Sequence, residues 1–204
     1  MSGSSSGKRA KSMARVDLHS RISRTLFTEE EIRTRVADLG RQLSSDYDAL
    51  RARDPERRPP LLVGILRGAL VFLSDLGRAM SIPVEYDLIS VSSYGNGTAP
   101  GAVRLVKDLE RPIEGRDLLL VEDIIDTGYT IEYLRRSFAA RNPASIRVCT
   151  LVDKVVRRET DIEIDYTGFT MESDAFVVGY GMDYAELYRN LPYIGALKPE
   201  FIRP

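Results

Sequence analysis

An apolar segment followed by an amphipathic helix constrains the fold of this chain more than any other feature. The segment Asp117–Val121 is apolar after its first residue, as expected for a strand that is buried on both faces of a parallel sheet. The next apolar side chains recur at helical spacing and mark one buried helix face, made by Ile131, Leu134 and Phe138. Asn142-Pro143 ends this helix, and the strand Ile146–Val152 completes a β-α-β unit. The sequence therefore predicts a doubly wound α/β fold with a mainly parallel sheet.

Elements on the N-terminal side fit the same sheet. Leu61–Leu66 is a second continuously apolar segment and predicts another buried strand. A helix is expected at Ala69–Met80 and a strand at Val84–Tyr94. A loop that contains glycine and proline, Gly95–Gly101, then leads to a returning strand at Val103–Val106.

A longer helix precedes these elements and begins near Glu29. Thr28 can cap it while the side chain of Glu31 returns the hydrogen bond. Apolar side chains recur every three or four residues as far as Leu50, and the charged, proline-rich segment Arg51–Pro60 ends the helix. We expect this helix to cover the core rather than to carry chemistry.

The C-terminal part is less regular. Short strands are predicted at Ile162–Tyr166, Ala175–Val178 and Tyr193–Leu197. We interpret them as a small hood subdomain over the end of the sheet, built from the N-terminal region and about residues 155–204. Residues 16–204 would then form a single domain. Residues 1–15 are rich in serine, lack the apolar segment of a secretory signal, and are expected to be a flexible tail or a tag.

Composition argues against several functional classes. The formal net charge is -1, so no general attraction to nucleic acid is indicated. No apolar run approaches the roughly 20 residues that a membrane helix needs. His19 is the only histidine, so a histidine base or a multi-histidine metal site is not expected. Cys149 is the only cysteine; we expect it to pack in the core of a protein of the reducing cytoplasm.

Two carboxylates stand where the predicted strand Asp117–Val121 ends. Glu122 and Asp123 are costly there unless a cation or a hydrogen-bond donor engages them. The next helix opens three residues later, and the free backbone amides of its first turn favour a phosphate. This layout fits ribose 5-phosphate with a magnesium ion. The loop has neither the Walker A spacing nor that of a dinucleotide motif. The alternative is an ordinary turn in which Asp126 or Thr127 caps the helix.

The ten-residue string Val121–Thr130, VEDIIDTGYT, resembles the phosphoribosyl-pyrophosphate motif of the type I phosphoribosyltransferases, especially of their hypoxanthine-guanine branch. The similarity runs from about Leu61 to Gly195. Further pieces agree in order and spacing, namely LVGILRGALVF, the Ser93-Tyr94 pair, CTLVDK and DAFVVGYGMDYAELYRNLPYIG. The resemblance implies the type I phosphoribosyltransferase fold, a doubly wound, mainly parallel sheet flanked by helices with a small hood subdomain.

The resemblance also implies which residues contact the sugar and its phosphate. Glu122 and Asp123 would hold the ribose hydroxyls and a magnesium ion. The 5-phosphate would be bound by Asp126, Thr127, Gly128, Tyr129 and Thr130. Asp126 would also face N7 of a purine and exchange its proton. Some relatives have a lysine at the position of Tyr129, and we expect the tyrosine side chain to face away from the phosphate.

Three further positions match residues that contact the purine in this family. Lys154 would donate to O6 of a 6-oxopurine, which discriminates against the 6-amino group of adenine. Phe176 would stack on the base, and Val177 would offer backbone groups to the edge of the base. Without the resemblance, Phe176 would be expected in the core.

The remaining matches concern pyrophosphate, metal and a loop. Pyrophosphate would be bound by Arg67, Gly68 and Arg189. Members of the family often have a cis bond before the first of these arginines, here at Leu66-Arg67. Asp183 resembles a ligand of a second magnesium ion, with an ordinary exposed loop carboxylate as the alternative. A loop that begins at Ser93-Tyr94 would close over the site and keep water out.

The resemblance implies a purine-salvage enzyme. It would use Mg²⁺ to transfer 5-phosphoribosyl from phosphoribosyl pyrophosphate to N9 of hypoxanthine or guanine and would release pyrophosphate. Xanthine also carries O6, so the sequence does not distinguish it from hypoxanthine and guanine as a substrate. A cytoplasmic homodimer or homotetramer is expected, with no nucleic-acid or membrane partner. Two alternatives remain. A nucleic-acid-binding regulator that reuses the fold is disfavoured by the net charge, and transfer to a pyrimidine or orotate conflicts with CTLVDK and FVVGYGMDY.

Overall fold

The structure, a computed structural model, describes residues 17–93 and 103–202. Its larger sheet has the strand order β4-β3-β2-β5-β6-β7. All neighbouring strands are parallel except β3 and β4. The strands are β2 (Leu61–Leu66), β3 (Glu85–Ser93), β4 (Val103–Lys107), β5 (Asp117–Ile125), β6 (Ser145–Lys154) and β7 (Tyr166–Met171). The predicted doubly wound, mainly parallel sheet is confirmed.

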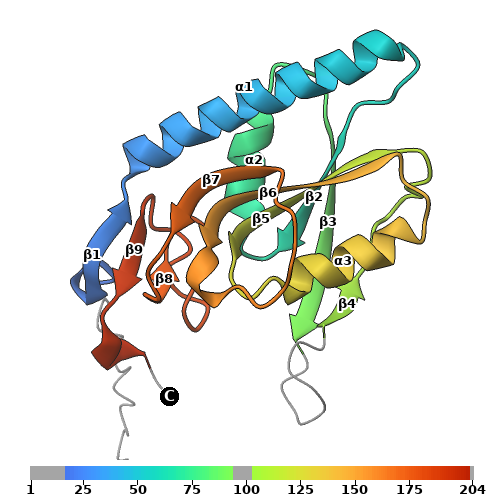
Figure 1. Ribbon diagram of the computed structural model, residues 1–204. Helices are drawn as coiled ribbons and strands as arrows, with labels where there is room; N and C mark the ends of the chain where they lie inside the picture. Colours follow the sequence, from blue (N-terminus) through green and yellow to red (C-terminus); the bar gives the residue numbers. More distant parts are fainter. Residues whose placement is uncertain (1–16, 94–102, 203–204) are drawn as a thin grey trace, which may run out of the picture.

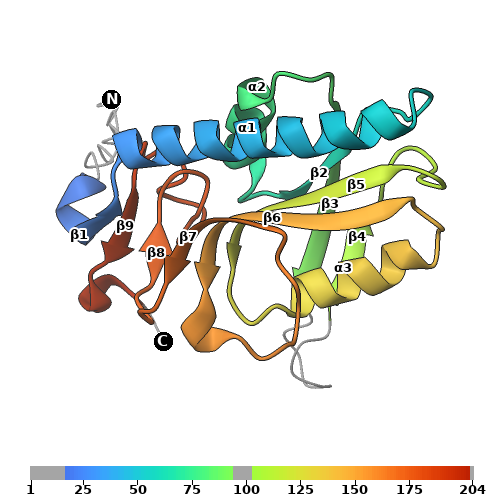
Figure 2. The same ribbon diagram turned by 45° about the horizontal axis from the view of Figure 1, so that its top comes forward.

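Helices cover both faces of this sheet. The helices α1 (Glu29–Arg53) and α2 (Leu70–Ala79) lie on one face, and α3 (Tyr129–Ala139) lies on the other (Figure 2). The alternation of side chains along β5 explains why both faces are apolar. Leu119 and Val121 pack in the core cluster under α1 and α2, whereas Leu118 and Leu120 pack in the cluster under α3. No helix in the described part of the chain is both long and apolar enough to span a membrane.

The start of α1 follows the predicted capping box. Thr28 Oγ1 accepts from the Glu31 amide at 3.3 Å, and Glu31 Oε2 accepts from the Thr28 amide at 2.8 Å. Farther along, α1 crosses α2 closely, because a Cβ added to Gly40 would lie 2.6 Å from the backbone oxygen of Ala79. This close contact fixes α1 against α2 on one face of the sheet.

The strand β5 is longer than predicted. Its predicted end was Val121, but β6 continues to pair with it, with Glu122 opposite Thr150 and Ile125 opposite Asp153. Pairing with β2 stops at Val121, opposite Gly64. The two carboxylates therefore lie in the last part of β5, which pairs with β6 but no longer with β2.

Three short strands form a second sheet, which we call the hood sheet. Its order is β1-β9-β8, all antiparallel, with β1 (Ile22–Phe27), β8 (Val177–Val178) and β9 (Ile194–Leu197). Segments from the two ends of the described chain thus lie side by side (Figure 1). Short 3-10 helices lie at His19–Arg21, Val155–Arg157 and Pro199–Phe201.

One predicted strand of the C-terminal part is displaced. The structure has no strand at residues 162–165, and β7 begins at Tyr166, where it joins the larger sheet beside β6. The side chain of Asp165 accepts from the amide of Val148 at 2.8 Å and so occupies the position of a ladder contact. Ile162 and Ile164 pack against the cluster under α3 instead. Their alternation therefore reflects packing of a loop and not a strand. The strand expected at Ala175–Val178 shortens to β8.

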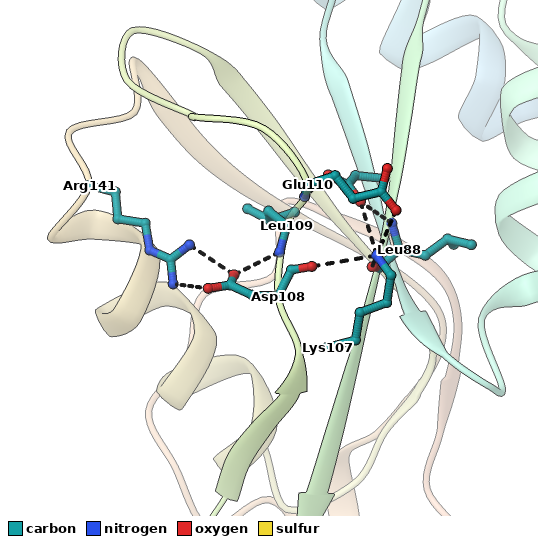
Figure 3. Close-up of polar contacts among 7 residues, drawn as sticks. Leu88, Lys107, Asp108, Leu109, Glu110 and Arg141 are labelled. Carbon is teal, nitrogen blue, oxygen red and sulfur yellow. Dashed lines mark hydrogen bonds and ion pairs between the residues drawn. The ribbon is translucent and has the colours of Figure 1, made fainter.

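A polar network fixes the chain where β4 ends (Figure 3). Lys107 Nζ donates to the backbone oxygen of Leu88 at 2.6 Å and lies 3.6 Å from the buried carboxylate of Asp87. Asp108 accepts two hydrogen bonds from Arg141, each at 2.8 Å. The antiparallel edge strand is thereby tied to β3 and to the end of α3.

Candidate active site

The carboxyl ends of β2 and β5 flank the point where the chain winds in opposite directions. After β2 the chain enters α2 on one face, and after β5 it enters α3 on the other, so this is the position at which open α/β sheets bind ligands. The turn after β2 is Arg67-Gly68, and the Leu66-Arg67 bond is cis, as predicted. A Cβ on Gly68 would lie 2.0 Å from Asp123 Oδ2. The Asp123 carboxylate therefore packs directly on the backbone of this turn.

Glu122 and Asp123 face two different cavities, because successive strand residues point to opposite sides. Asp123 lines a cavity of about 220 Å³ together with Lys154 and Phe176, which we call the larger site cavity. Glu122 lines a cavity of about 110 Å³ together with Asp126, Thr127, Gly128 and Thr130, which we call the smaller site cavity. Asp126 lines both cavities. A ligand that spans them would pass beside this carboxylate.

Both carboxylates of the pair are poorly solvated. Burial raises the pKa of Asp123 to about 6, although two backbone hydrogen bonds and nearby Arg189 act in the opposite direction. Burial, and then the charge of Asp123, raise the pKa of Glu122 well above its ordinary value. The buried atom Glu122 Oε2 has no hydrogen-bond partner among the described residues. A nearby cation would relieve both conditions.

These two carboxylates suit magnesium. No group of three or more His, Cys, Asp or Glu side chains within residues 17–93 and 103–202 is arranged to hold a metal. Magnesium is commonly held by one or two carboxylates together with substrate phosphates and water. Each carboxylate can supply a ligand of that kind, Asp123 at the larger site cavity and Glu122, with its unpaired buried oxygen, at the smaller one.

The loop 126–130 leaves the first turn of α3 open to an anion. Gly128 is the N-cap, with φ +94°, and no side chain caps the helix. The alternative in which Asp126 or Thr127 caps α3 is therefore wrong. The loop is held from behind, because the backbone oxygen of Thr127 accepts from the Glu159 amide at 3.0 Å and from Thr160 Oγ1 at 3.1 Å.

Tyr129 points away from the smaller site cavity. Its hydroxyl donates to Glu159 Oε2 at 2.9 Å, and the residue does not line that cavity, whereas Gly128 and Thr130 do. This turn therefore offers a ligand its backbone amides and the hydroxyls of Thr127 and Thr130.

Asp126 has an incompletely paired carboxylate. Its Oδ1 is buried and accepts no hydrogen bond within the described chain. The nearest cation is Arg157, whose Nε lies 3.6 Å from that oxygen and 3.8 Å from Asp174 Oδ1. Arg158 supports the same loop by donating to the backbone oxygen of Asp126 at 3.1 Å. Asp126 therefore has an acceptor that no hydrogen bond engages, and the residue lines the larger site cavity.

The opposite wall of the larger site cavity carries a buried lysine and an open aromatic ring. Lys154 Nζ donates to the backbone oxygen of Ala175 at 3.2 Å and lies 2.9 Å from Asp174 Oδ1. An ammonium group has three donors, so these contacts leave one for a ligand. Phe176 is 39% exposed and meets the Tyr184 ring edge-on at 5.3 Å.

The third side of the site is cationic. Arg189 Nη2 lies 2.7 Å from Asp183 Oδ1, and Arg189 Nη1 donates to the backbone oxygen of Gly181 at 2.8 Å. Arg67 Nη1 donates to Glu186 Oε2 at 2.6 Å. The structure thus brings the two predicted arginines to one carboxylate, that of Glu186, and the predicted Asp183, which pairs with Arg189, lines the larger site cavity.

One predicted site residue lies outside the described residues, and three residues that contact the site were not predicted from the sequence. Ser93 is the last residue of β3, where its backbone pairs with Val103, and Tyr94 is outside the described residues. Arg157, Asp174 and Glu186 contact predicted site residues but were not predicted. They lie in irregular segments whose spacing carries no signal, so only the contacts identify them.

A more spacious cavity of about 580 Å³ lies between α1, α2 and residues 189–192. Its walls combine apolar side chains such as Ile32, Val36 and Leu191 with charged ones at Asp75 and Arg78. Arg189 is the only predicted site residue among them. Cavity volume alone therefore does not identify the candidate active site. The polar groups that converge on the two site cavities identify it.

Comparison with known proteins agrees with this geometry. A family model described as the phosphoribosyl transferase domain matches residues 30–185. The hypoxanthine-guanine phosphoribosyltransferase of Bacillus subtilis is 49% identical over 179 residues, which cover 87% of this chain and 94% of that protein. The protein of the same name from Mycobacterium tuberculosis is 47% identical over 179 residues, or 87% of both chains.

Two further comparisons concern length and structure. The bifunctional protein TilS/HprT of Listeria monocytogenes is 47% identical over 184 residues, but this chain spans only 27% of its length. A crystal structure of a hypoxanthine phosphoribosyltransferase from Staphylococcus aureus superposes with a TM-score of 0.82 at 43% identity. The superposition covers 92% of this chain and 97% of that one.

Proposed function

The chain belongs to the phosphoribosyltransferase family, and we propose that it is a hypoxanthine-guanine phosphoribosyltransferase of purine salvage. The proposed reaction is the magnesium-dependent transfer of 5-phosphoribosyl from phosphoribosyl pyrophosphate to N9 of hypoxanthine or guanine, which gives IMP or GMP and pyrophosphate. Xanthine is a further candidate base. The names of the relatives that cover most of the chain support this activity.

One observation carries the proposal. The carboxylate of Asp126 lines both site cavities, so a purine in the larger one and a phosphate in the smaller one would meet beside it. A ribose that joins the two would lie along β5, next to Glu122 and Asp123. No other arrangement of the described polar groups offers an acidic bridge between an open helix N-terminus and a lysine with an aromatic ring.

The chain's own residues would first position the sugar. The backbone amides at the start of α3 and the hydroxyls of Thr127 and Thr130 would bind the 5-phosphate. Glu122 and Asp123 would accept from the ribose hydroxyls and hold Mg²⁺, and Asp183 would hold a second Mg²⁺. Bound magnesium supplies positive charge that offsets the charge of pyrophosphate. Holding the sugar by both ends removes rotational freedom before the glycosidic bond changes partners.

The base would be held by contacts that read a 6-oxopurine. The free donor of Lys154 would meet O6, and an adenine amino group at that place would face another donor. Phe176 would stack on the base, and the backbone of Val177 would contact the edge of the base. The Asp126 carboxylate would accept the N7 proton as N9 bonds to the sugar, and the place of Asp126 on both site cavities supports that role.

Pyrophosphate would leave through the cationic side of the site. Arg67, the Gly68 backbone and Arg189 would disperse its charge as the bond to the sugar weakens. The loop that begins at Ser93 and Tyr94 would exclude water from the positively charged sugar. These roles are part of the proposal.

The proposed protein is a cytoplasmic homodimer or homotetramer without a nucleic-acid or membrane partner. Residues 16–204 would form one domain in which the hood sheet covers the site, and residues 1–15 a flexible tail or tag. A regulator that binds nucleic acid is the second candidate. Strong, salt-dependent retention of RNA or DNA in a filter-binding assay would favour it over the enzyme.

The deciding experiment is a spectrophotometric assay of hypoxanthine, guanine and xanthine with phosphoribosyl pyrophosphate and MgCl₂. We expect nucleotide formation with at least one of hypoxanthine and guanine. Activity with uracil or orotate, together with none on a 6-oxopurine, would overturn the proposal.

Asp126→Asn tests the proton-handling role in the same assay. We expect turnover to fall by about 10²-fold or more, because an amide cannot accept the N7 proton. Calorimetric binding of phosphoribosyl pyrophosphate should stay close to that of the wild type. Asp161→Asn, a change at an exposed aspartate, is the matched control. Unaffected turnover in Asp126→Asn would remove Asp126 from this role.

A further inference from the structure

Glu186 holds both arginines that the proposed function assigns to pyrophosphate. Its Oε2 lies 2.6 Å from Arg67 Nη1 and 3.5 Å from Arg189 Nη2. The two guanidinium groups come from distant segments, one after β2 and one after β8. A single carboxylate oxygen thus connects the cations on the two sides of this part of the site.

The position of Glu186 is set by its backbone. The residue has φ +64°, in the left-handed region that side-chain-bearing residues rarely occupy. Its amide donates to Asp183 Oδ2 at 2.9 Å, and Tyr184 and Leu187 exchange backbone hydrogen bonds at 3.1 and 3.2 Å around it. A tight turn therefore presents the carboxylate to the arginines.

A pyrophosphate bound to these arginines would need the same donors. Guanidinium N–H groups form charge-assisted hydrogen bonds with carboxylates and phosphates alike. The N–H of Arg67 that now faces Glu186 cannot face a phosphate oxygen at the same time. The carboxylate and a leaving pyrophosphate therefore compete for the same cations.

We propose that Glu186 is a displaceable counter-ion of the pyrophosphate site. It holds Arg67 and Arg189 near each other when the site is empty, and it re-forms these ion pairs as pyrophosphate leaves. Its effect on the reaction is to weaken the binding of released pyrophosphate. The inference rests on the proposed function, because that function supplies the anion.

The size of the effect follows from exposure. The Arg67 and Glu186 side chains are 70% and 64% exposed, so solvent screens their attraction. Removing the negative charge should tighten pyrophosphate binding by about fivefold, which corresponds to about 1 kcal/mol. A larger change would require a more buried contact.

The test is titration calorimetry of the full chain with inorganic pyrophosphate and MgCl₂. In Glu186→Gln we expect the dissociation constant to fall by about fivefold, and the inhibition constant of pyrophosphate in the transferase assay to fall likewise. Glu186→Asp, which keeps the charge, should stay closer to the wild type. Glu56→Gln removes an exposed charge before β2, at the opposite end of that strand from Arg67, and should change nothing.

Unchanged or weaker binding in Glu186→Gln would overturn the inference. Loss of folding cannot imitate the expected result, because damage does not tighten binding. In an Arg67→Gln background the gain from Glu186→Gln should shrink, since Glu186 acts through that arginine; an undiminished gain would also count against the inference. Failure of the wild type to bind pyrophosphate would instead refute the proposed function, and the counter-ion role with it.

Discussion

Replacing Asp123 with asparagine should stabilise the metal-free protein while removing a ligand contact. The side chain is buried against the Gly68 backbone, and burial raises its pKa from the ordinary 3.8 to about 6. At pH 8 the folded protein must therefore keep a charge in a place that disfavours it. An amide of the same shape carries no such charge.

The magnitude follows from proton linkage. Between pH 3.8 and about 6 the folded protein retains a proton on Asp123 that the unfolded chain has lost, so the contribution of Asp123 to stability falls as pH rises through this window and is level above it. The interval corresponds to about 3 kcal/mol at 1.36 kcal/mol per pH unit. In Asp123→Asn the amide oxygen would keep only part of the backbone hydrogen bonds that the Asp123 carboxylate accepts. We therefore expect Asp123→Asn to gain about 1–3 kcal/mol at pH 8 and to lose this advantage near pH 4.

Urea unfolding in EDTA at pH 4, 6 and 8 measures this difference, with Asp161→Asn as the exposed control. With MgCl₂ and phosphoribosyl pyrophosphate present, the order should reverse, because only the wild type gains full stabilisation by its ligand. The reasoning fails if the difference between wild type and Asp123→Asn is the same at pH 4 and pH 8, or if the variant is less stable at pH 8.

Two further substitutions and one labelling experiment test other parts of the structure. Arg57 donates to both oxygens of the buried Asp117 at 2.5 and 2.6 Å, so Arg57→Ala should lower the free energy of unfolding by about 3 kcal/mol in urea titrations; a loss below about 1 kcal/mol would show that the pair is dispensable. Gly128 has φ +94°, and a Cβ added there would lie 2.0 Å from Thr160 Oγ1. Gly128→Ala should therefore reduce the free energy of unfolding by about 1–3 kcal/mol and weaken phosphoribosyl pyrophosphate binding in calorimetry. Binding at wild-type strength would contradict this. Burial raises the pKa of the Cys149 thiol, so a thiol reagent should label it only as fast as the protein unfolds, and rapid labelling of the folded protein would refute its placement.

Periodicity predicted the elements that pack on both sides. The strand Leu61–Leu66 was predicted with its observed bounds, because a continuous apolar run of this length is typical of a strand with helices on both faces. The capping box at Thr28 and Glu31 fixed the start of α1 in the same way. These signals are local, and the structure confirms them.

Signals that depend on a neighbouring strand could not be predicted. The sequence marks a chemical change after Val121, yet β5 continues because β6 offers hydrogen bonds as far as Ile125. Conversely, the alternation of Ile162 and Ile164 suggested a strand where the side chain of Asp165 occupies the ladder position. Pairing depends on a partner that is distant in sequence, and a single-segment pattern does not contain it.

The same distinction applies to the candidate site, where some residues were expected from the sequence and others are identified only by their contacts. Asp123, Asp126 and Lys154 were expected at the site because they belong to motifs at the ends of apolar segments, and the structure places all three on the larger site cavity. Their counter-ions could not, since Asp174 and Glu186 come from turns whose conformation alone brings them to a lysine and an arginine. The charge partners of site residues are therefore seen only in the folded structure and not in the sequence.

The pairing of β1 with β9 sets an order of assembly during synthesis. Every strand of the larger sheet lies between these two in the chain, so that sheet can form on the ribosome before β9 has emerged. Until then β1 presents unpaired backbone groups, which is the condition that favours aggregation at a sheet edge. A nascent chain cut short just before Ile194 would retain the larger sheet but lack the middle strand of the hood sheet. Synthesis of β9 thus protects the backbone groups of β1.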